Sequence, residues 1–190
     1  MLGTVGCFQR LEVPSEEQRA PSLVKAFTYA SHSRRLSAPD VATLKSRLKG
    51  EELALFLRLL EHLDQTCSGD DIACARGKLR EVTALYRDYS NADPESFEVQ
   101  LTVASGLFMI GQSALFNRID EELGRSLAEE GRGRVSQLAE RFPDEPMVHG
   151  QLAFMKTFEE GAEDEVSRHI RRCLALDPRT DWCRKLARRY

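Results

Sequence analysis

Apolar residues in this chain recur at spacings of three and four, and this periodicity constrains its fold more than any other feature. Two segments show it most clearly, with the sets Leu53, Phe56, Leu60, Leu63 and Phe97, Leu101, Ala104, Phe108. Such spacing places side chains on one face of an α-helix. No run of useful length alternates apolar and polar residues as a half-buried strand does. The sequence therefore predicts an all-α fold.

Proline, glycine and acidic residues divide the periodic segments into separate helices. We expect helices over about 22–35, 40–65 with a division at Gly50, 70–89, 94–110, 113–141, 147–158 and 164–176, and a short last one ending near 189. Asp70 and Asp71 suit a helix start, as does Asp40, whose carboxylate can accept from free N–H groups of the first turn, and Pro94 suits a first helical position. Gly111 is expected to end a helix. Gly131 and Gly133 are expected to kink or split another, because glycine costs about 1 kcal/mol in a helix interior.

The chain is organised as one domain with an N-terminal extension. Residues 1–20 hold little apolar periodicity, so we expect a mobile arm there. Residues 21–190 are expected to form a single all-helical domain, since 190 residues fit one domain.

Composition argues against nucleic acid and against a membrane-spanning segment. Hydrophobic residues make up 42% and charged residues 30%, as in a water-soluble globular protein, and the net charge is only −3. Lys and Arg are spread among acidic residues, whereas phosphate binding needs them clustered. No run of 18 apolar residues is present, so we expect no transmembrane helix.

Four of the five cysteines fall into two pairs, each across a predicted helix–turn–helix connection. Cys67 and Cys74 bracket a polar segment, and Cys173 and Cys183 flank the corner at Asp177-Pro178. Two helices joined by a short turn can bring cysteines to disulfide separation, and two disulfides are one interpretation. Four separate buried thiols are the other, because free cysteine is often buried. The spacings do not match those of a structural zinc site.

The fifth cysteine, Cys7, follows small residues in Leu2-Gly3-Thr4-Val5-Gly6 and is a candidate for lipidation. This context is similar to the end of a bacterial lipoprotein signal, which also needs an apolar segment upstream of Met1. Disulfides persist in oxidising compartments. Both features favour the bacterial cell envelope, either periplasmic or lipid-anchored, with the cytoplasm as the alternative.

The last third of the chain carries a family resemblance. Residues 173–178, Cys-Leu-Ala-Leu-Asp-Pro, resemble the end of the second helix of a tetratricopeptide repeat. Ala153 lies near a small-residue position of that motif, Gly161 lies at the turn between paired helices, and Ala92-Asp93-Pro94 resembles an earlier ending. The resemblance is clearest over 147–190. The aromatic residue expected early in the first helix is absent, and the period is irregular, so the repeats are degenerate.

The resemblance implies antiparallel helical hairpins in a degenerate, tetratricopeptide-like right-handed array. A C-terminal capping helix would present Trp182, Leu186 and Tyr190 on its apolar face. Such arrays bind a protein or peptide in a concave face lined by the first helices of each pair. That face would include parts of 95–110 and 147–158, where Gln100, Ser105, Gln151 and Lys156 could contact a partner.

No set of residues predicts catalysis. The histidines, His32, His62, His149 and His169, lack metalloprotease spacing, and no glycine-rich phosphate loop is present. We expect no catalytic residues, no cofactor and no metal. The sequence favours a non-enzymatic interaction or scaffold protein, for example in an envelope assembly or secretion system. A small cytosolic regulator or a toxin-neutralising immunity protein is the alternative.

Overall fold

The structure, a computed structural model, describes residues 42, 46, 57 and 71–190. Within 71–190 the chain forms helices and no strand, so the predicted all-α class is confirmed for this part. The helices are α4 (Ile72–Ala92), α5 (Phe97–Phe116), α6 (Glu121–Arg141), α7 (Pro146–Lys156), α8 (Glu163–Leu176) and α9 (Asp181–Ala187). The predicted arm over 1–20 and the first two predicted helices lie outside the described residues, apart from the three isolated positions.

Side-chain caps account for where three of the helices begin. The Asp71 carboxylate accepts from the backbone N–H of Cys74 at 2.9 Å, which confirms the predicted start of α4. Ser96 caps α5 and Asp120 caps α6 in the same way. Each cap satisfies a backbone donor that has no partner within its own helix. Pro94 was wrongly predicted as the first residue of α5, because it lies in the turn before Ser96.

Three glycines that were predicted to break helices lie inside them instead. Gly111 is within α5, and α6 runs unbroken through Gly131 and Gly133. A Cβ at Gly111 would lie 2.5 Å from the backbone N of Ala128, and one at Gly131 would lie 2.5 Å from the backbone O of Ala104. These two glycines therefore let the backbones of α5 and α6 approach closely, which outweighs the helix-propensity cost.

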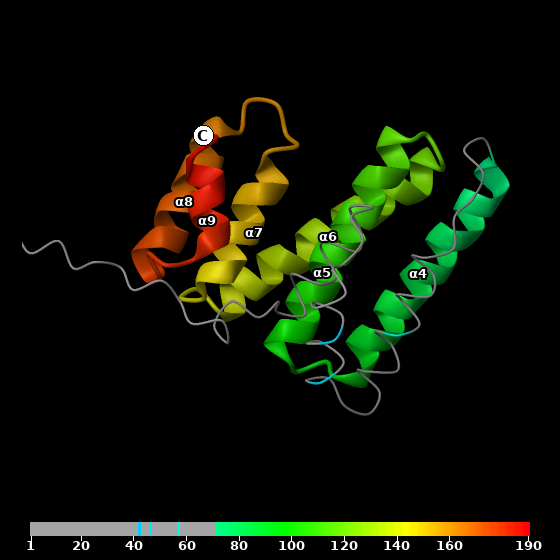
Figure 1. Cartoon of the computed structure of the whole chain (residues 1–190), viewed down its shortest axis with the longest axis horizontal. Helices are drawn as coiled ribbons and strands as arrows, with labels where there is room; N and C mark the ends of the chain where they lie inside the picture. Colours follow the sequence, from blue (N-terminus) through cyan, green and yellow to red (C-terminus); the bar gives the residue numbers. More distant parts are fainter. Residues whose placement is uncertain (1–41, 43–45, 47–56, 58–70) are drawn as a thin grey trace, which may run out of the picture.

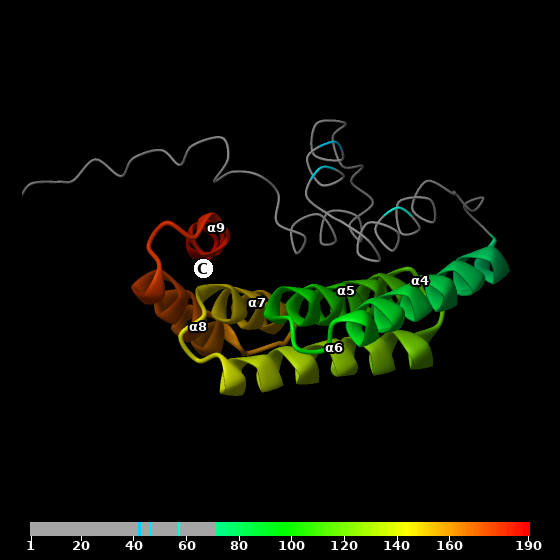
Figure 2. The same ribbon diagram turned by 90° about the horizontal axis from the view of Figure 1, so that it is seen from below.

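Short connections turn the chain back after each helix, so that successive helices run antiparallel (Figure 1). These connections cover 93–96, 117–120, 142–145, 157–162 and 177–180. α5 packs chiefly against α6, and α7 packs chiefly against α8. Figure 2 shows α5, α7 and α9 on one side of the array and α6 and α8 on the other, with α4 at the end opposite to α8 and α9. The described residues thus form a row of helical hairpins.

The apolar core follows this row as three clusters. One lies between α4, α5 and α6, the second joins α5 and α6 to α7, and the third joins α7, α8 and α9. α5 contributes to the first two, and Val103, Ala104, Leu107 and Phe108 on it are fully buried. By length and hydropathy α5 could also cross a membrane, but 67% of its most apolar window is buried inside the protein. Its apolarity is that expected of the central helix of this core.

The C-terminal helix α9 is held onto the last hairpin by a cysteine pair and an indole. Cys173 of α8 and Cys183 of α9 lie at disulfide distance, with a Cα–Cα separation of 6.4 Å, and both are buried. Trp182 donates from its ring nitrogen to the carbonyl of Gly150 in α7 at 3.3 Å. Leu186 is buried as expected of a capping face, whereas Tyr190 is 54% exposed and was wrongly assigned to that face.

Candidate partner-binding groove

A groove with many polar side chains runs along α6, beside α4 in one part and beside the start of α5 in the other. It consists of two hollows of about 600 and 520 Å³, and an ion pair joins Arg87 of the first to Glu130 of the second. We call it the α4–α6 groove. The first hollow is lined by Arg80, Thr83, Ala84, Arg87, Asp88, Asp120, Glu122, Leu123 and Ser126, and the second by Gln100, Glu130, Gly133, Arg134, Gln137, Leu138 and Arg141.

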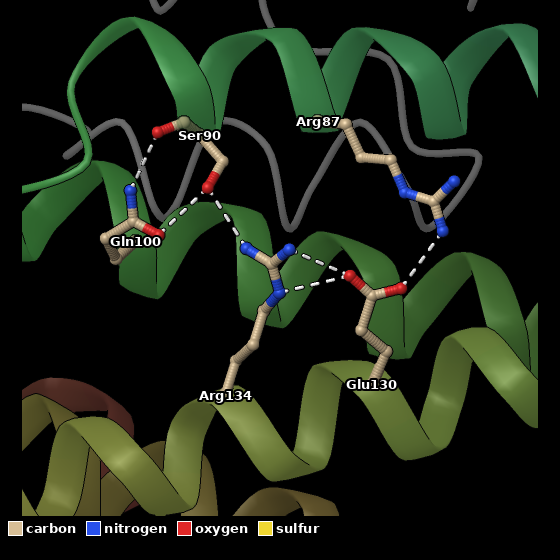
Figure 3. Close-up of polar contacts among 5 residues, drawn as sticks. All are labelled: Arg87, Ser90, Gln100, Glu130 and Arg134. Carbon is tan, nitrogen blue, oxygen red and sulfur yellow. Dashed lines mark hydrogen bonds and ion pairs between the residues drawn. The ribbon is translucent and has the colours of Figure 1, made fainter.

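One carboxylate of this groove makes two ion pairs, of which one joins α6 to α4. Glu130 of α6 accepts from Arg87 of α4 at 3.2 Å and from Arg134, one turn further along α6, at 2.8 Å. Figure 3 shows the Glu130 side chain between the two guanidinium groups. The carboxylate is thus shared by a contact between helices and a contact within one helix. The second belongs to the i,i+4 class that supports isolated helices.

The network continues from Arg134 to the end of α4 and the start of α5 (Figure 3). Arg134 donates to the Ser90 hydroxyl at 3.0 Å, and that hydroxyl donates to the Gln100 side-chain oxygen at 2.9 Å. The Gln100 amide nitrogen donates to the backbone carbonyls of Ser90 at 3.0 Å and Asp93 at 3.1 Å. Because the last carbonyls of a helix lack partners within it, Gln100 closes the C-terminal end of α4. The polar residues of this corner therefore hold three helices in register.

Three other charged residues of the groove do not belong to this network. Arg80 and Asp88 of α4 and Glu122 of α6 are exposed on its walls. Within the described residues, none of these three makes a side-chain hydrogen bond or ion pair. Both signs of charge are therefore available to a binding partner, next to the internally paired network.

Two residues of the predicted partner-binding face prove to be interior. Ser105 of α5 is 1% exposed and Gln151 of α7 is 3% exposed. The Gln151 amide donates to the Ser105 hydroxyl, and that hydroxyl donates to the carbonyl of Leu101 at 2.7 Å. The prediction that these side chains contact a partner was wrong, because they satisfy each other where α5 meets α7. Polar residues on a helical stripe look alike in sequence whether they face solvent or a neighbouring helix.

The other two residues of that face are partly exposed and already bonded within the chain. Gln100 belongs to the network at the end of α4. Lys156 pairs with Glu159 at 2.8 Å and with Glu165 at 3.0 Å. The pKa of Lys156 is raised mainly by its hydrogen bond to Glu159, and the pKa of Glu165 is lowered mainly by its hydrogen bond from Lys156. Lys156 thus stabilises the turn between α7 and α8.

Among the candidate cysteines, the structure brings together Cys173 and Cys183. Cys7, the candidate for lipidation, and Cys67, the predicted partner of Cys74, lie outside the described residues. Those two predictions remain predictions.

Gln100 was singled out by sequence reasoning, whereas the other residues of the groove network were not, although one signal pointed to part of that network. Glu130 and Arg134 are four residues apart on a predicted helix, which is the spacing of a helical ion pair. Arg87 and Ser90 belong to another helix, and nothing in the local sequence pairs them with α6. Comparisons with protein-family models, with curated proteins and with solved structures give no match for this chain.

Proposed function

We propose that this protein is a non-enzymatic interaction protein, built as a degenerate tetratricopeptide-like array, that holds a segment of a partner protein in the α4–α6 groove. The observation that carries the proposal is the groove itself, with Arg80, Asp88 and Glu122 exposed on its walls and unpaired within the described chain. Paired and unpaired groups of both signs suit recognition of a polypeptide by hydrogen bonds and ion pairs.

The arrangement of the helices supports the repeat interpretation. In a tetratricopeptide array, each hairpin packs on the next, and each first helix also meets its counterpart in the following hairpin. This scheme fits two hairpins, α5/α6 and α7/α8, followed by α9 as the first helix of a third pair. In agreement with it, α7 contacts α5, α6, α8 and α9. α7 and α9 begin at Pro146 and Asp181, a spacing of 35 residues, close to the roughly 34-residue tetratricopeptide period. The α5/α6 pair is longer, as degenerate repeats allow.

Charge reversal within the groove tests the proposal. The variant Arg80→Glu with Glu122→Lys reverses two charges on opposite walls and leaves the net charge unchanged. The matched control, Arg125→Glu with Glu129→Lys, makes the same exchanges at exposed positions of α6 that do not line the groove. The tagged full chain is crosslinked in lysate of its native host, and captured proteins are identified by mass spectrometry. We expect the groove variant to lose a partner that the wild type and the control both capture.

Equal capture by the wild type and both variants would overturn the assignment of the groove. A chain that captures no protein reproducibly would overturn the interaction function itself. Circular dichroism of each variant checks that its helical content is unchanged.

We further propose that the protein works in the bacterial cell envelope. The support is the buried Cys173–Cys183 pair at disulfide distance, since disulfides persist chiefly in oxidising compartments. Peptide mapping without reduction, on protein alkylated during lysis of the native host, is expected to recover these two cysteines in one crosslinked peptide. Recovery of both as alkylated thiols would contradict this location.

A further inference from the structure

Two histidines from different helices meet on the α7/α8 hairpin. The Nδ1 atoms of His149 in α7 and His169 in α8 lie 3.4 Å apart, and their ring planes differ by 24°. Both side chains are half-buried. The two helices are the main packing partners of each other, so the ring positions are set by the hairpin core, not by a mobile loop.

A backbone carbonyl orients the first of these rings. Nε2 of His149 lies 2.9 Å from the carbonyl oxygen of Pro143, and only a protonated Nε2 can donate to that oxygen. In the neutral ring this leaves the lone pair on Nδ1. Histidines that bind metals almost always donate their other ring N–H to a carbonyl or carboxylate in this way. His149 therefore already has the tautomer that a metal ligand requires.

The separation of the two nitrogens matches the distance between two ligands of one zinc ion, while the rings themselves must turn to bind it. Zinc binds imidazole nitrogen at about 2.0–2.1 Å with tetrahedral angles, which places two ligand nitrogens roughly 3.3–3.4 Å apart. We propose that Nδ1 of His149 and Nδ1 of His169 together bind one zinc ion or a similar divalent transition-metal ion. The ring centroids lie 5.7 Å apart, so in the metal-free pair the two Nδ1 atoms face each other along one line, as for a shared proton. The ion lies beside that line, so each ring turns toward it by roughly 35°. Water molecules complete its coordination.

Proton balance does not oppose this binding at neutral pH. In the metal-free pair, His169 donates from Nδ1 to His149, so its Nε2 carries the lone pair. On metal binding the proton leaves Nδ1 of His169 and Nε2 gains one through solvent, with no net release.

The surroundings set the affinity and the kind of metal. Lys156 and Arg168 act against a cation at His169, whereas the carboxylate of Glu165 favours one. Within 71–190 no third His, Cys, Asp or Glu joins the pair to form a larger ligand group. We therefore expect binding weaker than that of a complete structural zinc site. Imidazole ligands select zinc, copper or nickel over calcium and magnesium.

Calorimetric titration with zinc chloride tests the site. It uses the full chain, kept oxidised and freed of metal with a chelator, and the variants His149→Ala and His169→Ala. A chain with His32→Ala and His62→Ala is the matched control, because it loses two histidines outside the pair. We expect the wild type and the control to bind zinc alike, and each single variant to bind it at least about tenfold more weakly.

A second measurement separates this site from zinc bound by free thiols and does not depend on the variants folding. In ¹⁵N spectra of the wild-type imidazoles, zinc is expected to shift Nδ1 of His149 and His169. Cobalt in place of zinc is expected to give no thiolate charge-transfer absorption. Unchanged His149 and His169 signals, thiolate absorption from the bound cobalt, or undiminished zinc binding by both folded single variants would each overturn the proposal.

Discussion

At the scale of single residues, the glycines show how one residue type takes opposite roles in one helix. Gly131 and Gly133 lie two positions apart in α6. Gly131 is buried against the backbone of α5, whereas a Cβ at Gly133 would meet nothing within 4 Å. Sequence alone assigns both the same helix-breaking tendency. Only the position of α5 distinguishes a packing glycine from an incidental one.

This difference predicts opposite effects of the same substitution. Gly131→Ala places a Cβ 2.5 Å from backbone atoms of Ala104 and Phe108, so we expect the free energy of unfolding to fall by about 1–3 kcal/mol. Gly133→Ala meets open space and reduces the entropy of the unfolded chain, so we expect a gain of about 0.5–1 kcal/mol. Denaturant titration measures both. Equal effects of the two substitutions would contradict the close approach of α5 and α6.

The histidine pair predicts how stability depends on pH. Because burial and the neighbouring His149 lower the pKa of His169 in the folded protein, the unfolded chain takes up this proton first as pH falls. The contribution of His169 to the free energy of unfolding is complete above the unfolded histidine pKa of about 6.5, and it is lost as pH falls through the lower pKa of the folded state. We expect the denaturation midpoint of metal-free protein to rise from pH 5 to pH 7, and to rise less steeply in His169→Gln. Equal slopes for the two proteins would argue against the coupling.

At the scale of elements, α9 shows that a short helix needs tertiary support. It spans Asp181–Ala187, and a helix of this length is marginal in water by itself. Cys183, Trp182 and Leu186 provide that support through Cys173, Gly150 and the core of the last hairpin. The helix was predictable from the Asp177-Pro178 corner, but the residues that hold it in place were only partly so.

Breaking the cysteine pair is therefore expected to release α9. A disulfide between residues ten positions apart lowers the entropy of the unfolded chain, which stabilises the folded state by about 2–3 kcal/mol. The free energy of unfolding of the variant Cys173→Ala with Cys183→Ala should therefore be lower by roughly this amount. Trp182, the single tryptophan, should move toward solvent and shift its fluorescence to longer wavelength on reduction of the wild type. The double variant is the control, and its emission should not respond to reductant. A reductant response in that variant would show that another cysteine controls α9.

At the scale of the whole molecule, the described part behaves as a row in which each helix depends on its neighbours. α5 contacts α4, α6 and α7 and contributes to two core clusters, while α9, among the described helices, packs chiefly against α7 and α8. Stability in such arrays follows the sum of neighbouring interfaces. The row also creates the α4–α6 groove, which belongs to no single helix.

This arrangement predicts an order of local opening. We expect the backbone amides in the middle of α5 to exchange hydrogen most slowly and those of α9 to exchange fastest among the helices α4–α9. Hydrogen-exchange mass spectrometry of the oxidised protein measures this order directly. Protection of α9 equal to that of α5 would indicate one cooperative unit and not a row.

The sequence by itself determined the helical class of the described part and the limits of α4, α7 and α8 to within three residues, because apolar periodicity, caps and prolines act within a few residues of each other. The predicted end of α5 and start of α6, at 110 and 113, were wrong, because Gly111 lies inside α5. In this way Asp70-Asp71 predicted the start of α4, and the Asp177-Pro178 corner predicted the end of α8. The tertiary structure decided which polar and small residues face a neighbouring helix. Ser105 and Gln151 bond to each other across 46 positions, and Arg87 reaches Glu130 across 43. Contacts over such distances depend on how helices pack, and a single sequence carries no local signal of that.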